Sequence, residues 1–180
     1  MQSRLTLLTV LLTIASSCCA SDLPDPRITP GVIDTQITQQ NIHATICVRG
    51  YSKTVRPPAY YTNALKKRQI RALGYADKNP RSYEEDHHIA ISIGGHPRDE
   101  RNLWPQPRNS EWGAERKDEL EFVLYKMVCT NEIALNDAQH AMATDWIAAW
   151  KRYVPTHKAY RYPKAGQGKG KGNGDFIPFD

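Results

Sequence analysis

The stretch from residue 85 to residue 107 constrains the fold of this chain most, because it combines apolar alternation with strong turn formers. It reads EDHHIAISIGGHPRDERNLWPQP. Isoleucines at positions 89, 91 and 93 predict a short strand with one buried face, begun by residues 83–86. Gly94-Gly95 then breaks the strand into a loop that closes at Asn102, before Leu-Trp-Pro. We expect a helix to follow from near Ser110, with apolar residues at helical spacing from Leu120 to Val128.

Two side chains at the start of this stretch can support hydrolysis. Asp86 offers the hard carboxylate oxygen that Mg²⁺ or Mn²⁺ prefers. The adjacent His87 has an ordinary pKa of about 6.5, so it can accept a proton near neutral pH. His88 must point to the opposite face of a strand. We interpret it as a packing or surface histidine, with metal ligation as the alternative.

The order of these features resembles the HNH, or ββα-metal, endonuclease superfamily. Within it, the chain is similar to small secreted proteins with the pattern D-H-x-I-P-L-x-L-G-G followed by N-L-W-P. The sharpest similarity covers the middle third of the chain, and a looser similarity continues to about Tyr153. An Asp-His pair alone would carry no information, whereas the whole ordered pattern is specific. One departure is Ala90, where the family usually has proline.

This resemblance implies an α+β fold, in which a ββα-metal finger is joined by additional packed helices. It also implies that His87 acts as general base while Asp86 holds one divalent ion, Mg²⁺ or Mn²⁺. The Asn102 amide would hydrogen-bond the loop backbone and so orient the histidine. The third residue on the metal side has no clear equivalent. Glu115 is the first choice, with Asn109, Glu111 and Asp118 also in range.

The charge balance is compatible with a nucleic-acid partner. The chain has 24 lysines and arginines against 19 acidic residues, a formal net charge of +5, which permits a polyanionic partner without requiring one. Four basic residues share one predicted helix, and two flank the Asn-Leu-Trp-Pro segment, where they could contact phosphates. They are Lys66, Lys67, Arg68, Arg71, Arg101 and Arg108. A solvated helix surface is the alternative reading of the first four.

The first twenty residues have the composition of a signal peptide. Arg4 precedes an apolar stretch from Leu5 to Ala15, and small residues up to Ala20 form a cleavage site. We therefore expect a secreted or periplasmic protein. The apolar stretch is shorter than the roughly 20 residues of a membrane span. No stable membrane association is expected unless Cys18 or Cys19 is lipidated.

Cys47 and Cys129 are the two cysteines that follow the expected signal peptide. An even pair in an exported chain favours a disulfide. The bond would close a loop of about 80 residues and stabilise the fold by on the order of 4 kcal/mol. Two buried free thiols are the alternative.

The rest of the chain predicts one domain. Residues 21–35 should form an irregular N-terminal segment, and β-branched residues between 36 and 48 predict a short N-terminal β region. We expect one helix from Thr62 to Leu73, with Gly74 in the left-handed C-terminal position, and another from about Asn136 to Tyr153. The nuclease-like domain would span residues 36–160, and residues 161–180 would form a flexible tail containing Gly and Lys.

Together these features predict an exported, monomeric endonuclease that hydrolyses the phosphodiester bonds of DNA, with RNA as a further substrate. Nothing in the chain resembles a base-reading module, so cleavage should show little sequence specificity. Two other functions stay open. The finger could be catalytically inactive and bind nucleic acid or protein, or the same residues could hydrolyse another phosphoester.

Overall fold

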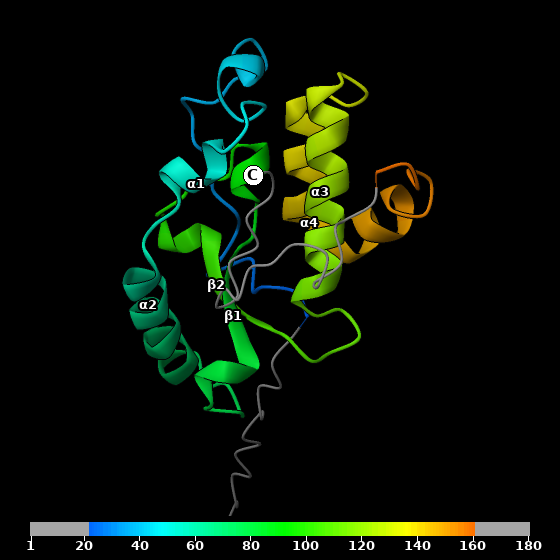
Figure 1. Ribbon diagram of the computed structural model, residues 1–180. Helices are drawn as coiled ribbons and strands as arrows, with labels where there is room; N and C mark the ends of the chain where they lie inside the picture. Colours follow the sequence, from blue (N-terminus) through cyan, green and yellow to red (C-terminus); the bar gives the residue numbers. More distant parts are fainter. Residues whose placement is uncertain (1–21, 161–180) are drawn as a thin grey trace, which may run out of the picture.

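A two-stranded antiparallel hairpin lies between two groups of helices in the computed structural model, which describes residues 22–160 (Figure 1). Strand β1 covers Tyr83–His87 and strand β2 covers Leu103–Pro107. Asp86 lies opposite Trp104, and His87 lies opposite Leu103. The expected signal peptide with Cys18 and Cys19, and the expected tail, lie outside the described residues.

The helices cover the hairpin from two sides (Figure 1). Helix α2, Ala59–Ala72, packs against both strands. Helix α3, Ala114–Cys129, packs against α4, Leu135–Tyr153, and against the turn that follows β1. A short helix, α1, covers Tyr51–Val55. The α+β class is therefore confirmed as an antiparallel hairpin packed against helices.

The strand predicted through Ile89 to Ile93 is wrong. Strand β1 ends at His87, and Ile91–Ile93 forms a 3₁₀ turn, η3, closed by Gly94 with a φ of 80°. All residues from 89 to 95 are buried, so the alternating isoleucines do not separate an inner face from an outer one. The second strand follows a further 3₁₀ turn, η4, Glu100–Asn102, at the point where the sequence predicts only the end of a loop.

The short β region predicted between residues 36 and 48 is also wrong. This segment forms turns and a 3₁₀ helix, η1, Ile42–Ala44. Ile37 and Ile42 lie five positions apart, which on one strand would place them on opposite faces. Both are buried in the same core, and turns satisfy that requirement where a strand could not.

The N-terminal segment, residues 22–35, is irregular as predicted, yet it packs closely against the loop between the strands. The His96 amide donates to the Val32 carbonyl over 2.7 Å, and the Gly31 amide donates to the Arg101 carbonyl over 3.1 Å. An isolated bridge joins Ile33 to Gly95. This segment therefore packs against the loop that follows the end of β1.

Two helix starts differ from the prediction. Helix α2 begins at Ala59, directly after Pro58, rather than near Thr62, because proline is tolerated where a helix begins. Helix α3 begins at Ala114 rather than near Ser110, since the Gly113 amide closes a turn onto the Ser110 carbonyl over 3.2 Å. A further 3₁₀ turn, η2, Pro80–Ser82, leads into β1. Gly74 has a φ of 69° in the left-handed region, as predicted.

The core between α3 and α4 agrees with the helical periodicity of the sequence. The residues expected on the apolar faces are buried, namely Leu120, Val123, Leu124, Met127, Val128, Ala138, Met142, Trp146 and Ala149. Asp145 has non-helical backbone angles and bends α4.

Cys47 and Cys129 form the predicted disulfide, which ties the turn after η1 to the last residue of α3. The bond agrees with the oxidising compartment expected from the sequence. Among the described residues, no helix combines the length and apolar character needed to cross a membrane.

Candidate active site at the hairpin

Asn102 cross-links the loop between the strands. Its Oδ1 accepts hydrogen bonds from the amides of Ile89 and Val32, over 2.9 and 3.3 Å, and its Nδ2 donates to the carbonyls of Ile89 and His96, both over 3.0 Å. The residue is fully buried. The predicted hydrogen bonds from the Asn102 amide to the loop backbone are thus confirmed. They set the conformation of the chain directly after His87.

The His87 ring has a defined orientation. Its Nε2 lies 3.0 Å from the carbonyl oxygen of Pro97. Because a carbonyl oxygen can only accept, Nε2 carries the hydrogen of the neutral ring and Nδ1 keeps its lone pair. Burial, followed by the positive charge of Arg56, lowers the pKa of His87 from 6.5 to about 4. The imidazole is therefore neutral at pH 7, the form that a general base requires.

His88 takes a packing position, in agreement with its interpretation from the sequence. Its Nδ1 lies 2.9 Å from the carbonyl of Thr29, and the residue is buried. Burial, followed by the charge of Lys117, lowers its pKa to about 4. His88 thus ties the N-terminal segment to the end of β1.

Asp86 pairs with a lysine that the sequence interpretation missed. The Lys117 Nζ, on α3, donates to Asp86 Oδ2 and to the His87 carbonyl, both over 2.6 Å, and also to Glu121 Oε1. Lys117 is fully buried. Its position relative to Leu120, Leu124 and Val128 shows that Lys117 and Glu121 extend the apolar stripe of α3. This helical spacing in the sequence could have indicated that both side chains face inward.

Further carboxyl groups surround this cluster and shift its pKa values. Burial raises the pKa of Glu121 to about 7, against the lowering effect of Lys117. Burial, then the charges of Glu121 and Asp86, raise the pKa of Asp118 well above its ordinary value. Burial also opposes ionisation of Asp86, but Lys117 outweighs it and lowers the Asp86 pKa. The pair that holds its charges most firmly is therefore Asp86 with Lys117.

The residues around Asp86 do not fit the divalent ion that the resemblance implies. One carboxylate oxygen of Asp86 already accepts a hydrogen bond from the Lys117 ammonium, which has no exposed surface. Within residues 22–160, no group of three or more His, Cys, Asp or Glu side chains is arranged to hold a metal ion. An ammonium beside the carboxylate would repel a second cation.

Glu115, the first choice for a further metal ligand, lies on the exposed side of α3. It precedes the inward-facing Lys117 by two positions, which corresponds to roughly 200° around the helix. Glu111, also considered as a ligand, precedes the start of this helix. Lys117, rather than Glu115, is the residue of α3 that contacts Asp86.

The six basic residues predicted to contact phosphates do not all line the same cleft. Arg101 pairs with Asp99 through two bonds of 3.0 and 2.7 Å, and Arg68 pairs with Glu100 over 2.5 Å. Arg71 is exposed on α2. The other three, Lys66, Lys67 and Arg108, line one cleft of about 630 Å³.

This cleft lies between α2 and β1 and carries charges of both signs. Arg81, which is not among the six predicted phosphate contacts, also lines it, as do Glu84 and Glu85. Arg108 pairs with Glu84 over 2.8 Å. Both carboxylate oxygens of Glu85 are buried without a hydrogen-bond partner, and burial raises its pKa well above the ordinary value. Glu85 lines the cleft and precedes His87 by two residues on β1. The cleft therefore lies roughly 7 Å along the strand from the histidine.

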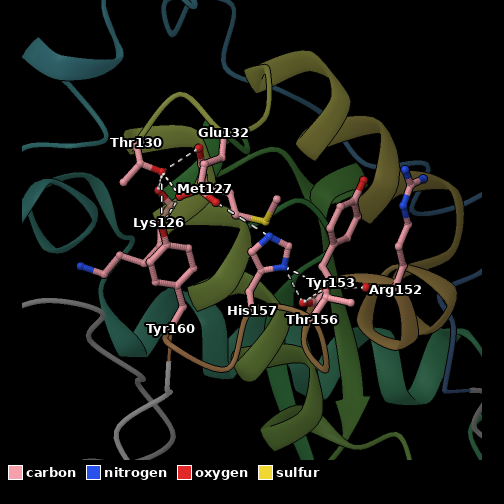
Figure 2. A network of polar contacts seen from close by, with 9 residues as sticks. All are labelled: Lys126, Met127, Thr130, Glu132, Arg152, Tyr153, Thr156, His157 and Tyr160. Carbon is pink, nitrogen blue, oxygen red and sulfur yellow. Dashed lines mark hydrogen bonds and ion pairs between the residues drawn. The ribbon is translucent and has the colours of Figure 1, made fainter.

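A second polar network lies at the C-terminal end of α3 (Figure 2). Thr130 Oγ1 donates to Glu132 over 2.8 Å, and the Tyr160 hydroxyl donates to the same carboxylate. His157 Nδ1 lies 2.8 Å from the Tyr153 carbonyl. These contacts hold the segment after α4 against the end of α3.

No family model, curated protein or solved structure that was compared with the chain matches it. The fold and site define an α+β protein whose antiparallel hairpin packs against helices. At the end of β1 it carries a buried cluster of histidine, carboxylate and lysine.

Proposed function

We propose that this protein is an exported phosphodiesterase that cleaves nucleic acid, with His87 as its general base. The observation that carries the proposal is the His87 ring, neutral and oriented by the Pro97 carbonyl so that Nδ1 keeps a lone pair. Asn102 supports it by holding the adjacent loop in one conformation. The ordered motif shared with HNH endonucleases agrees with these roles.

In the proposed reaction, Nδ1 of His87 takes a proton from water as the water oxygen attacks phosphorus. A new P–O bond forms opposite the ester bond that breaks, and the departing oxygen takes a proton from solvent. Asp86 does not act on the substrate in this scheme, because its Oδ2 accepts a hydrogen bond from Lys117. The residues at Asp86 do not fit the predicted Mg²⁺ or Mn²⁺, and the proposed reaction proceeds without it.

The proposed substrate is DNA or RNA, bound through its phosphates. Lys67, Arg81 and Arg108 line the cleft beside β1 and can contact phosphates that flank the scissile bond. Such contacts carry no base information. Cleavage should therefore show little dependence on sequence.

The test is digestion of plasmid DNA and of RNA, in separate reactions with Mg²⁺, with Mn²⁺ and with EDTA. The wild-type protein should produce fragments, and His87→Ala should produce none while still binding DNA. His140→Ala is the matched control, because His140 is exposed on α4. Equal cleavage by the wild-type and His87→Ala proteins would contradict the assignment of the base.

A second candidate function is binding of nucleic acid without cleavage. It is favoured by the burial of His87, which is 2% exposed, and by the pairing of Asp86 with Lys117. The same digestion distinguishes the two candidates. Binding without fragments in every buffer would support the inactive finger.

A further inference from the structure

Three oxygen atoms surround the Lys117 ammonium at the end of β1. It lies 2.6 Å from Asp86 Oδ2, 2.6 Å from the His87 carbonyl oxygen, and within hydrogen-bond distance of Glu121 Oε1. An ammonium has three N–H donors. All three are used, and none is left for solvent or substrate.

These three oxygen atoms are of the kind that make up part of the coordination shell of a hard cation. Two carboxylates and a carbonyl are the oxygen ligands that Mg²⁺ and Mn²⁺ prefer. Burying a lysine is costly unless its charge is fully paired, and here Asp86 and Glu121 supply opposite charges from two elements. The Lys117 ammonium therefore lies where these oxygens converge, and two of them carry the charge that offsets its own.

We propose that Lys117 is the resident cation of this site, in the position at Asp86 that the sequence assigns to a divalent ion. This inference rests on the proposed function. Lys117 does not touch the substrate, so it is a positioning residue: it holds the Asp86 carboxylate and, through the His87 carbonyl, the backbone of the base. Cleavage then requires no divalent ion at Asp86.

The first arm of the test uses the unmodified protein and the metal alone. Titration with Mn²⁺, followed by electron paramagnetic resonance, should show no specific bound ion. Nucleic-acid cleavage should proceed at the same rate in EDTA as in Mg²⁺. A bound Mn²⁺ that Asp86→Ala removes, or cleavage that EDTA stops and Mg²⁺ restores, would overturn the proposal.

The second arm removes the lysine. Lys117→Ala leaves the two carboxylates and the carbonyl facing an empty space, so this variant should gain a Mn²⁺ site and a Tm that rises with Mn²⁺. The double variant Asp86→Ala, Lys117→Ala should lose both gains. Lys126→Ala, on the same helix, is the matched control and should show neither. A folded Lys117→Ala that gains no Mn²⁺ site would also overturn the proposal.

The two arms separate this inference from the function on which it rests. Cleavage that depends on Mg²⁺ would refute the resident cation and leave the phosphodiesterase standing. A complete lack of cleavage in every buffer would refute the phosphodiesterase, while the Mn²⁺ titrations would still decide what occupies the site. If Lys117→Ala does not fold, the titration of the wild-type protein decides alone.

Discussion

His87 and His88 are neighbours in the chain, but their rings meet different partners. His87 contacts the Pro97 carbonyl near the loop, and His88 contacts the Thr29 carbonyl of the N-terminal segment. His87 is the last residue of β1, and His88 lies in the bend that follows the strand. These different contacts make one a candidate base and the other a packing residue.

Both histidines should remain neutral well below their ordinary pKa. In the folded protein their pKa values are about 4, against 6.5 for the unperturbed group, chiefly because of burial. Between these values the unfolded chain binds protons that the folded chain does not. Each histidine thus contributes stability that is present above pH 6.5 and is lost as the pH falls toward 4, at most about 3 kcal/mol.

NMR titration of the imidazole signals tests this prediction. Neither ring should titrate between pH 7 and pH 5 in the folded protein, and both should titrate near pH 6.5 in urea. Glu121 acts in the opposite sense on stability, because its pKa is raised to about 7. As the pH falls, the folded chain therefore protonates Glu121 before the unfolded chain does, and this raises stability. Because the two effects oppose each other in a measurement of stability, the imidazole signals are the better test. A folded-state titration near pH 6.5 would contradict the burial.

Asn102→Ala should destabilise the protein strongly. The change leaves the amide and carbonyl of Ile89 and the carbonyl of His96 without their partner. Buried groups left unpaired cost about 1–3 kcal/mol each, so a loss of about 3–5 kcal/mol is expected. Urea unfolding measures it, with Asn109→Ala, an exposed asparagine after β2, as the control. A loss equal to that of the control would show that the loop does not depend on Asn102.

At the scale of elements, α3 supplies the apolar stripe of the core and also the lysine that contacts Asp86. Leu120 and Leu124 pack into the core, and Lys117 and Glu121 continue the same face toward β1. One helix face therefore passes from apolar packing to a charged cluster within about one turn. A mutation on this face can therefore affect both the packing of the fold and the candidate site.

The cleft between α2 and β1 should dominate the salt dependence of DNA binding. In a His87→Ala background, which removes the proposed base, Lys67→Ala should reduce the log-log salt slope by about one unit. Arg101→Ala should change it less, because Arg101 is paired with Asp99 outside the cleft. Fluorescence anisotropy over a range of KCl concentrations gives both slopes. A larger effect for Arg101 than for Lys67 would place the phosphate contacts on the loop instead.

At the scale of the whole molecule, the disulfide joins parts of the chain that are far apart in sequence. Cys47 and Cys129 are separated by 82 positions, so the bond closes a long loop in the unfolded chain. The double variant Cys47→Ser, Cys129→Ser should lose about 4 kcal/mol in the free energy of unfolding. Chemical denaturation measures the loss, and the reduced wild-type protein should reproduce it. Two reactive thiols in the unreduced, denatured protein would show that the bond does not form.

The features that depend on a single helix could be predicted from the sequence. The buried faces of α3 and α4 and the left-handed Gly74 follow from spacing and backbone preference within a few residues. The disulfide required only a count of two cysteines in an exported chain. The Asn102 contacts agreed with a role taken from the motif.

The positions of the strands and the partner of Asp86 required the tertiary structure. The isoleucines after β1 and the residues between them are all buried. Their alternation in the sequence therefore suggested a strand with one buried face, where the chain forms a 3₁₀ turn. Lys117 lies 31 positions from Asp86, and lysine side chains are usually exposed to solvent. The sequence by itself determined which side chains are available for chemistry, because that depends on residue type. Only the fold decided that Lys117 meets Asp86, because long-range packing brings their two elements together.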